Sequence, residues 1–289
     1  MSAKRNREIS FVELTVVGPD RTGIVASVTK FVFKSGGNIE AVEQNVSKGI
    51  FYMTLRISMK SKEFSKESFE KGTSSVGKRL GMEIKIRYEQ DGGLKNMAIL
   101  VTKEENTLKA LLEAREKGKI RVNVPLVIGT TTALEGFVGD HGIPFHHVES
   151  LDQEDRETRI LQLLETSDID FIVLARYMRI LSPRFLWRYP NRIINIHPSL
   201  LPAFPGASAY MQAFERGVRV GGVTAHFATV DLDQGPIIWQ ESFEIRPNES
   251  LNSIKLRGRR AEAKTLLKAV SLYLDDKIGI RWGKVTIKR

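Results

Sequence analysis

RIINIHPSLLPAFPGASAYMQAFERGVRVGGVTAHFATVDLDQG, residues 192–235, is the stretch from which the fold and the chemistry of this chain can be inferred. Its first six residues predict a buried strand in which β-branched residues alternate with Asn195 and His197. Side chains two residues apart on a strand share a face, so a carboxamide and an imidazole should emerge side by side. Pro198 has no backbone N–H, which makes His197 the last ladder residue before a loop.

A carboxylate should join this pair from a later strand. Residues 223–229 predict that strand, and Asp231-Leu-Asp233-Gln-Gly235 follows it, with the glycine allowing a sharp turn beneath a carboxylate. In an open α/β sheet, ligands bind at such strand ends. Asn, His and Asp together suit attack on an acyl carbonyl, because Asn can donate to the developing oxyanion, His can move protons and Asp can orient or activate. The same residues could instead satisfy loop backbone, with Asp233 as a turn former.

Three motifs in this stretch resemble, in order and spacing, those of the folate-dependent formyltransferase family. They are Asn195-Ile-His197-Pro-Ser-Leu-Leu-Pro-Ala-Phe-x-Gly206, Gly222-x-Thr-x-His226-Phe and Asp231-x-Asp233-x-Gly235-x-Ile. The resemblance implies three catalytic residues. Asn195 would be the oxyanion donor, and His197 would be an electrostatic stabiliser or a proton donor toward the folate nitrogen. Asp233 would orient His197 and is a candidate base for water.

The resemblance extends to a folate pocket. Leu174-Ala-Arg-Tyr-Met-Arg179-Ile-Leu181 matches the family's segment that forms an apolar wall for the pterin. It therefore assigns folate binding to Arg179, Ile180, Leu181, Asp231 and Gly235. One departure from the family is Pro205, where many relatives carry Lys or a large apolar residue, and it bears on the loop after Phe204.

Composition indicates an ordinary globular protein with room for two domains. The chain has 289 residues, of which 42% are hydrophobic, and no cysteine, which excludes disulfides and thiolate metal sites. No apolar run approaches the ~20 residues of a membrane span, and the start MSAKRNREISF lacks an apolar leader core, so we expect a cytoplasmic protein without a membrane partner. The net charge of +10 comes from Lys and Arg spread along the chain. We therefore expect no nucleic-acid partner, and a surface that attracts an anionic small molecule such as a folate with its glutamate tail.

Residues 1–90 predict a separate domain with the ferredoxin-like order β-α-β-β-α-β. Its expected elements are strand 9–17, helix 24–34, strands 38–46 and 50–59 joined by a hairpin at 47–49, helix 62–80 and strand 82–88. Asp20 or Thr22 should cap the first helix. The apolar face of that helix should comprise Val25, Val28, Phe31 and Val32.

The turn before that helix carries a second resemblance. Gly18-Pro-Asp-Arg-Thr-Gly-Ile-Val, with Gly37-Asn-Ile39 after the helix, resembles the ACT family of regulatory domains, which bind small amino acids. The resemblance implies a regulatory site at Asp20, Gly23 and Asn38, with glycine or methionine as the effector. Exposed sheet edges are commonly covered by pairing with a second copy, so we expect a homodimer or homotetramer.

Residues 95–289 predict a doubly wound, mostly parallel, Rossmann-like α/β domain, reached through the polar stretch 90–93. Strands are expected at 97–102, 122–128, 144–148, 171–175, 192–197, 223–229 and 236–245, and helices at 107–116, 132–141, 156–164, 183–187 and 250–274. Strands alternate with helices through most of this order, which is typical of a parallel sheet.

The first strand-to-helix turn of this domain separates the members of the family. Relatives that formylate glycinamide ribonucleotide have a glycine-rich turn there, whose amides hold a phosphate. Here the turn, Val101-Thr-Lys-Glu-Glu-Asn106, has no glycine and carries two acids, which should repel a phosphate. An ACT-like domain ahead of a formyltransferase-like domain resembles instead the formyltetrahydrofolate deformylases. That resemblance implies hydrolysis of 10-formyltetrahydrofolate to formate and tetrahydrofolate without a cofactor, which supplies formate for purine synthesis and balances the one-carbon pool.

Other classes of protein remain open on the sequence. They are a formyltransferase with an amine acceptor such as glycinamide ribonucleotide, a non-catalytic folate or amino-acid sensor, and a metal hydrolase built on His197, His226 and Asp233 with His146 or His147. The chain has no HExxH or similar helix-spaced pair, so we predict no metal site. His226, on a strand, is better explained as a packed, hydrogen-bonded histidine.

Overall fold

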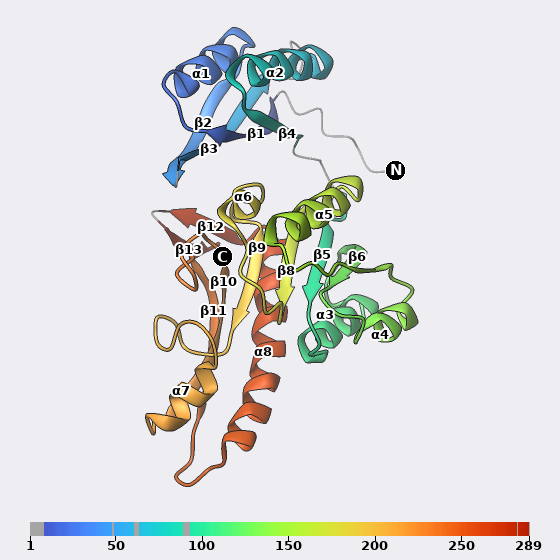
Figure 1. The fold of residues 1–289 in the computed structure, drawn as a ribbon, viewed down its shortest axis with the longest axis vertical. Coiled ribbons are helices and arrows are strands. Elements are labelled where there is room, and N and C mark those ends of the chain that lie inside the picture. The colour runs from blue at the N-terminus through green and yellow to red at the C-terminus, as the bar shows by residue number, and fades with distance from the viewer. Residues whose placement is uncertain (1–8, 48, 61–63, 89–92, 282, 289) are drawn as a thin grey trace. The chain divides into compact units, whose positions relative to one another are not determined.

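The chain divides into two compact units, Met1–Gly93 and Leu94–Arg289. The computed structural model describes residues 9–47, 49–60, 64–88, 93–281 and 283–288 (Figure 1). The predicted linker residues 90–92 and the start of the predicted helix at residues 62–63 lie outside the described residues.

The N-terminal unit has the predicted ferredoxin-like order. Its elements are β1 (Ile9–Pro19), α1 (Ile24–Lys34), β2 (Asn38–Ser47), β3 (Ile50–Lys60), α2 (Lys66–Leu80) and β4 (Glu83–Tyr88). They form an antiparallel sheet with the order β2-β3-β1-β4, and Ser47 pairs with Ile50 where the hairpin was expected. Alternate residues of β1 and β3, including Leu14 and Leu55, form a buried core with the two helices. The ferredoxin-like prediction is confirmed.

Two details of helix α1 differ from the prediction. Ile24 is 1% exposed and Val25 is 40% exposed, so the buried face comprises Ile24, Val28 and Val32. Val28 and Val32 are buried as predicted and Phe31 packs against the core, so only Val25 is wrong, with Ile24 in its place. A repeat of 3.6 allows either neighbour at the first turn of a short helix. The predicted cap from Asp20 or Thr22 is also wrong. The N-cap residue is Gly23, whose φ of 84° lies in the left-handed region, and no side chain caps the helix.

The C-terminal unit contains a seven-stranded sheet with the order β11-β10-β9-β8-β5-β6-β7. Its elements are β5 (Asn96–Val101), α3 (Asn106–Glu116), β6 (Asn123–Gly129), α4 (Glu135–Asp140), β7 (Phe145–His147), α5 (Gln153–Thr166), β8 (Phe171–Ala175), α6 (Pro183–Leu186), β9 (Ile193–His197), α7 (Ala209–Glu215), β10 (Val220–Phe227), β11 (Ile237–Glu244), α8 (Leu251–Leu274), β12 (Ile278–Arg281) and β13 (Lys284–Ile287). Strands β5 to β9 run parallel, whereas β10 is antiparallel to both of its neighbours. The doubly wound, mostly parallel prediction is confirmed.

Both faces of this sheet are buried. Residues of β5 and β8 alternate between a core under α3, α4 and α8 and a core under α5 and α6. The chain leaves β5 toward β6 and β7 on one side and returns to β8 on the other side. Such a reversal opens a crevice at the carboxyl ends of the strands, which is where ligands bind in open α/β sheets.

Three elements were not predicted. Helix α7 has seven residues and no side-chain cap, so it lacks the long periodic pattern that identifies a helix in sequence. Strands β12 and β13 have four residues each and form a separate two-stranded sheet. Ile278 and Val285 of this hairpin pack against the main core.

Gly235 has a different role from the one predicted. The left-handed backbone belongs to Asp233, with a φ of 56°, and Gly235 is the point of closest approach to a neighbouring strand. A Cβ atom on Gly235 would lie 1.8 Å from the carbonyl oxygen of Phe227, which is fixed in β10. Glycine is therefore required at this position because there is no space for a side chain, and not because of its backbone φ.

Gly235→Ala should lower the free energy of unfolding by roughly 2–3 kcal/mol, because the loop must move away from β10 to admit a methyl group. Gly136→Ala is the matched control. Gly136 is exposed in α4, a Cβ there meets no atom within 4 Å, and alanine should raise helix stability by about 0.5–1 kcal/mol. Urea titration of the three proteins measures both effects. Equal stability of Gly235→Ala and the wild type would contradict the close approach.

Candidate active site

A cavity of about 560 Å³ lies at the carboxyl ends of β8 and β9. Its wall includes residues 176–181 after β8, residues 195–198 at the end of β9, and residues 228–230 after β10. Loop residues 206–208, the start of α7 and three residues of α8 also line it, as do Glu104, Leu232 and Asp233. The cavity occupies the crevice that the strand order predicts for a ligand.

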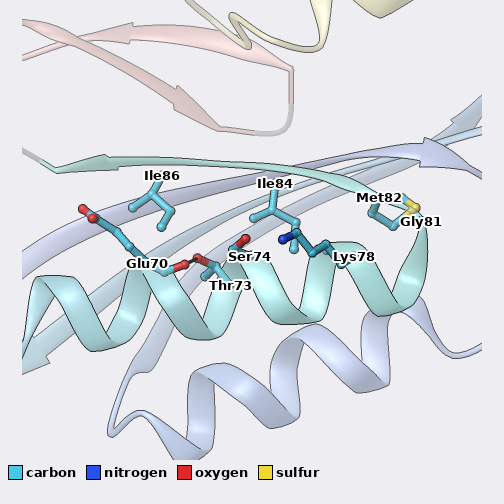
Figure 2. A pocket seen from close by; sticks show the side chains of 9 residues that line it. Glu70, Thr73, Ser74, Lys78, Gly81, Met82, Ile84 and Ile86 are labelled. Carbon is cyan, nitrogen blue, oxygen red and sulfur yellow. Dashed lines mark hydrogen bonds between the residues drawn. The ribbon is translucent and has the colours of Figure 1, made fainter.

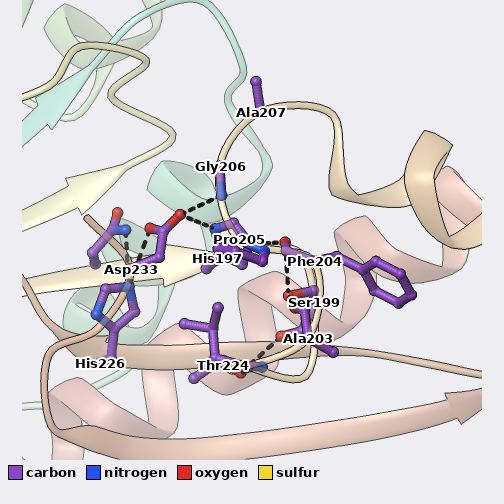
Figure 3. A network of polar contacts seen from close by, with 12 residues as sticks. His197, Ser199, Ala203, Phe204, Pro205, Gly206, Ala207, Thr224, His226 and Asp233 are labelled. Atoms are coloured by element: carbon purple, nitrogen blue, oxygen red, sulfur yellow. Dashed lines mark hydrogen bonds and ion pairs between the residues drawn. The ribbon is translucent and has the colours of Figure 1, made fainter. Parts of the chain in front are cut away.

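The structure brings Asn195, His197 and Asp233 together at this cavity (Figure 3). Asn195 and His197 lie two residues apart on β9 and share a face. Nδ1 of His197 is 3.3 Å from Oδ2 of Asp233, and both side chains are almost fully buried. Asn195 joins through His226, since its Nδ2 lies 3.2 Å from Nε2 of that histidine.

Both ring nitrogens of His197 face acceptors. Nε2 is 2.9 Å from the carbonyl oxygen of Phe204, which can only accept, so Nε2 carries a proton. On the other side of the ring, Nδ1 faces the Asp233 carboxylate. An ionised carboxylate also only accepts, so Nδ1 carries a proton as well. The arrangement therefore favours an imidazolium held between a carbonyl and a carboxylate.

The loop after β9 holds the Phe204 carbonyl in place. The Ser199 hydroxyl donates to Ala203 O at 2.5 Å and lies 3.3 Å from Phe204 O. Thr224 of β10 donates to Ser199 O at 2.7 Å while accepting from Leu201 N. Pro205, the departure noted in the sequence, is accommodated in this loop. The next residue, Gly206, donates its backbone N–H to Oδ2 of Asp233 at 2.7 Å.

Asp233 is held in the ionised form. Burial raises the pKa of its carboxyl, but the hydrogen bonds from His197 and Gly206, with the charge of the imidazole, outweigh burial and lower the pKa below its ordinary value. Both of those donors act on Oδ2. Within the described part of the chain, Oδ1 has no hydrogen-bond donor, and Nε2 of His226 lies 3.8 Å away. Oδ1 is thus the oxygen that can accept a proton or a hydrogen bond from a molecule in the cavity.

His226 is buried and hydrogen-bonded, as expected, but it also lines the cavity, which was not expected. Its Nδ1 lies 2.9 Å from Phe227 O, and burial lowers the pKa of the ring. The Gly-x-Thr-x-His-Phe motif marked this residue in the sequence. His226 lies next to Asn195 because β9 pairs with β10 and the two residues are partners in that ladder.

A second polar cluster lines the same cavity and was missed by sequence reasoning. Arg176 has one amino group 3.2 Å from Glu104 and its Nε 3.6 Å from Glu262, and Tyr210 donates its hydroxyl to Glu262 at 2.6 Å. Arg259 lies 3.6 Å from the second oxygen of Glu104. Burial raises the pKa of Glu262. Glu104 belongs to the acidic turn after β5, so its charge is compensated by two arginines and repels anions less than the sequence suggested.

The predicted folate residues divide into two groups. Arg179, Ile180 and Leu181 line the cavity. Asp231 and Gly235 do not: Asp231 is exposed, and Gly235 is buried against Phe227. Within the Asp-Leu-Asp segment, Leu232 and Asp233 line the cavity instead.

The predicted regulatory residues line no described cavity. The backbone N–H of Asp20 donates to Gly49 O, and the Asn38 carboxamide donates to Glu40 at 2.8 Å. The cavity described in the N-terminal unit, about 490 Å³, lies between α2 and β4 and is lined by Glu70, Thr73, Lys78, Ile84 and Ile86, among others (Figure 2).

His197 and His226 of the metal hypothesis converge on Asp233, but His146 and His147 do not join them. His146 and His147 lie on β7, at the opposite edge of the sheet from the strands that carry His197 and His226. Among the residues that the structure describes, no group of three or more His, Cys, Asp and Glu side chains could hold a metal ion. In the same residues, no helix has the length and hydropathy to cross a membrane.

Comparison with known proteins gives relatives for both units. The model of the formyl transferase family matches residues 95–270, and that of the ACT domain matches residues 10–87. The chain is 36% identical to formyltetrahydrofolate deformylase of Bacillus subtilis, over 95% of this chain and 92% of the relative. It is 35% identical to the enzyme of the same name from Synechocystis, over 92% and 94%.

Solved structures agree with the sequence relatives. A formyltetrahydrofolate deformylase from Pseudomonas syringae has a TM-score of 0.67 and 29% identity, covering 99% of this chain and 96% of that chain. Glycinamide ribonucleotide transformylase 1 from Symbiobacterium toebii has a TM-score of 0.66 and 30% identity. The two structures superpose over 70% of this chain and 97% of the transformylase chain.

Proposed function

Since the chain belongs to the formyl transferase family and, within it, to the formyltetrahydrofolate deformylases, we propose that it hydrolyses 10-formyltetrahydrofolate to formate and tetrahydrofolate. The observation that carries the proposal is the convergence of Asn195, His197 and Asp233 at one cavity. The named relatives that span nearly all of this chain are deformylases, whereas the named transformylase covers 70% of it. Formate so released would supply purine synthesis and help to balance one-carbon folates.

The geometry suggests how the reaction proceeds. Water attacks the formyl carbon, and the carbonyl oxygen becomes an oxyanion that the Asn195 N–H and the positive charge of His197 stabilise. Oδ1 of Asp233, with no protein donor among the described residues, accepts a proton from the attacking water. As the C–N bond breaks, that proton passes to the leaving nitrogen of tetrahydrofolate. His197 supplies positive charge and orients Asp233, and the protons on its own ring take no part in the transfer.

The cavity also suits the substrate. Leu181 is buried in its wall, and the exposed apolar side chains of Ile180 and Leu232 border it, so a pterin ring can stack on apolar surface. Arg179 and Lys255 line the same cavity and would attract the glutamate carboxylates.

Acceptor-free hydrolysis is tested by incubating the pure protein with 10-formyltetrahydrofolate alone and measuring formate and tetrahydrofolate. We expect equal amounts of both products, at a rate that glycinamide ribonucleotide does not raise. Asn195→Ala serves as the control for spontaneous breakdown. Formate at only the spontaneous rate, with turnover after glycinamide ribonucleotide is added, would support an amine-acceptor formyltransferase instead.

We further propose that the ACT domain binds glycine or methionine as an effector, that the enzyme is a homodimer or homotetramer, and that it works in the cytoplasm without a cofactor. The support is the ACT match over residues 10–87 and the exposed edge strand β2. Removal of residues 1–92 should abolish any response of turnover to these amino acids and reduce the oligomer. A truncated protein that keeps both properties would show that the ACT domain confers neither.

A further inference from the structure

His226 is placed opposite Asn195 by the sheet itself. The two residues are partners in the antiparallel ladder between β9 and β10, so their side chains emerge on the same face. On its other side, β10 shifts register against β11 between Ala225 and His226. Such an irregularity re-aims a side chain and is frequent beside active sites. The imidazole is 1% exposed, and Figure 3 shows it beside Asp233.

The hydrogen bonds of His226 define its tautomer. Phe227 O can only accept, so Nδ1 carries a proton. Burial lowers the pKa of the ring below its ordinary value and outweighs the attraction of Asp233, which favours the neutral form. Nε2 is therefore an unprotonated acceptor. The charged groups nearest to it are the Asp233 carboxylate, whose Oδ1 is 3.8 Å away, and the His197 ring.

This acceptor determines which way the Asn195 carboxamide points. The nitrogen of the carboxamide lies 3.2 Å from Nε2, and one of its two N–H groups donates to it. In the described residues no other hydrogen bond holds this side chain, so the second N–H is available to the cavity. Rotated by half a turn, the carboxamide would present its oxygen to Nε2, where two acceptors repel each other. The oxyanion would also lose its donor.

We propose that His226 is a positioning residue that holds the Asn195 carboxamide with its N–H toward the reacting carbonyl. In this role it acts through Asn195 alone. The inference rests on the proposed function in one respect, namely that Asn195 donates to the oxyanion. It assigns to His226 neither metal binding nor proton transfer.

Two substitutions separate positioning from packing. In His226→Gln the amide oxygen reaches the place of Nε2 and restores an acceptor, whereas in His226→Asn the shorter amide reaches only the place of Nδ1. We expect His226→Asn to lower kcat by about 10- to 100-fold, less than the roughly 10²- to 10³-fold loss when the oxyanion donor is removed outright. The KM for 10-formyltetrahydrofolate should stay unchanged, and His226→Gln should recover most of the loss. A folded His226→Asn variant with wild-type kcat, or a folded His226→Gln variant no better than it, would overturn the proposal.

A double-mutant cycle isolates the coupling. If His226 acts through Asn195, then His226→Asn should cause no further loss of kcat in an Asn195→Ala background. An equal fold loss in both backgrounds would show that His226 acts independently of Asn195, and the proposal would be wrong.

If a variant fails to fold, the proposal can still be tested on the wild-type protein by a measurement that does not depend on activity. Nitrogen-15 NMR of the wild-type ring should show His226 neutral at neutral pH, protonated on Nδ1, with one Asn195 side-chain proton coupled to Nε2. A ring protonated on Nε2 would overturn the proposal. If the expected tautomer is found but the wild type releases no formate, the proposed function fails while the hydrogen bond that positions Asn195 stands.

Discussion

Asp233→Asn is expected to lower kcat by about 10⁴-fold, comparable to the loss of other carboxylates that pair with a catalytic histidine. The carboxamide has the same size and can still accept from the Gly206 N–H through its oxygen. It carries no charge to balance the His197 imidazolium and has no oxygen basic enough to take a proton from water. The variant should therefore fold and bind folate but release almost no formate.

Asp231→Asn is the matched control for this prediction. Asp231 lies two residues earlier in the same loop, is exposed, and does not line the cavity. Its replacement should leave kcat at the wild-type value in the same formate assay. An inactive Asp231→Asn together with an active Asp233→Asn would show that the roles of the two carboxylates are reversed.

Asn195→Ala is expected to lower kcat by about 10²- to 10³-fold, because the developing oxyanion loses its neutral donor. The KM should change little, since the donor matters most once negative charge has formed on the oxygen. Steady-state formate release measures both constants. Asn123→Ala is the control: it removes an exposed carboxamide at the start of β6, away from the cavity, and should leave both kcat and KM unchanged. A kcat of Asn195→Ala equal to that of the control would exclude Asn195 as the oxyanion donor.

The sequence was sufficient for the architecture of both units. The repeat of two in β9, ended by Pro198, predicts that Asn195 and His197 share a face, and the structure shows them together. Errors occurred where local patterns are short or ambiguous. The apolar repeat of α1 fits Val25 as well as Ile24, and α7 and the β12–β13 hairpin are too short to produce a clear period.

The missed part of the site depends on tertiary structure. Glu104, Arg176, Tyr210 and Glu262 come from four separate segments, and no spacing in the sequence relates them. Their ion pairs exist because the turn after β5, the end of β8, α7 and α8 meet at one cavity. The same holds for His226, whose contact with Asn195 requires β10 to pair with β9 in one register. Gly235 was misread because sequence shows that a glycine is present but not whether φ or space requires it.

The most direct test of hydrolysis at this site is a reaction of the wild-type protein with 10-formyltetrahydrofolate in water labelled with oxygen-18, without any amine acceptor. The account predicts that each tetrahydrofolate formed is accompanied by one formate carrying one labelled oxygen, and that Asp233→Asn abolishes both products above the spontaneous rate. Tetrahydrofolate formed without labelled formate would show that the formyl group goes to an acceptor other than water, and it would contradict the account.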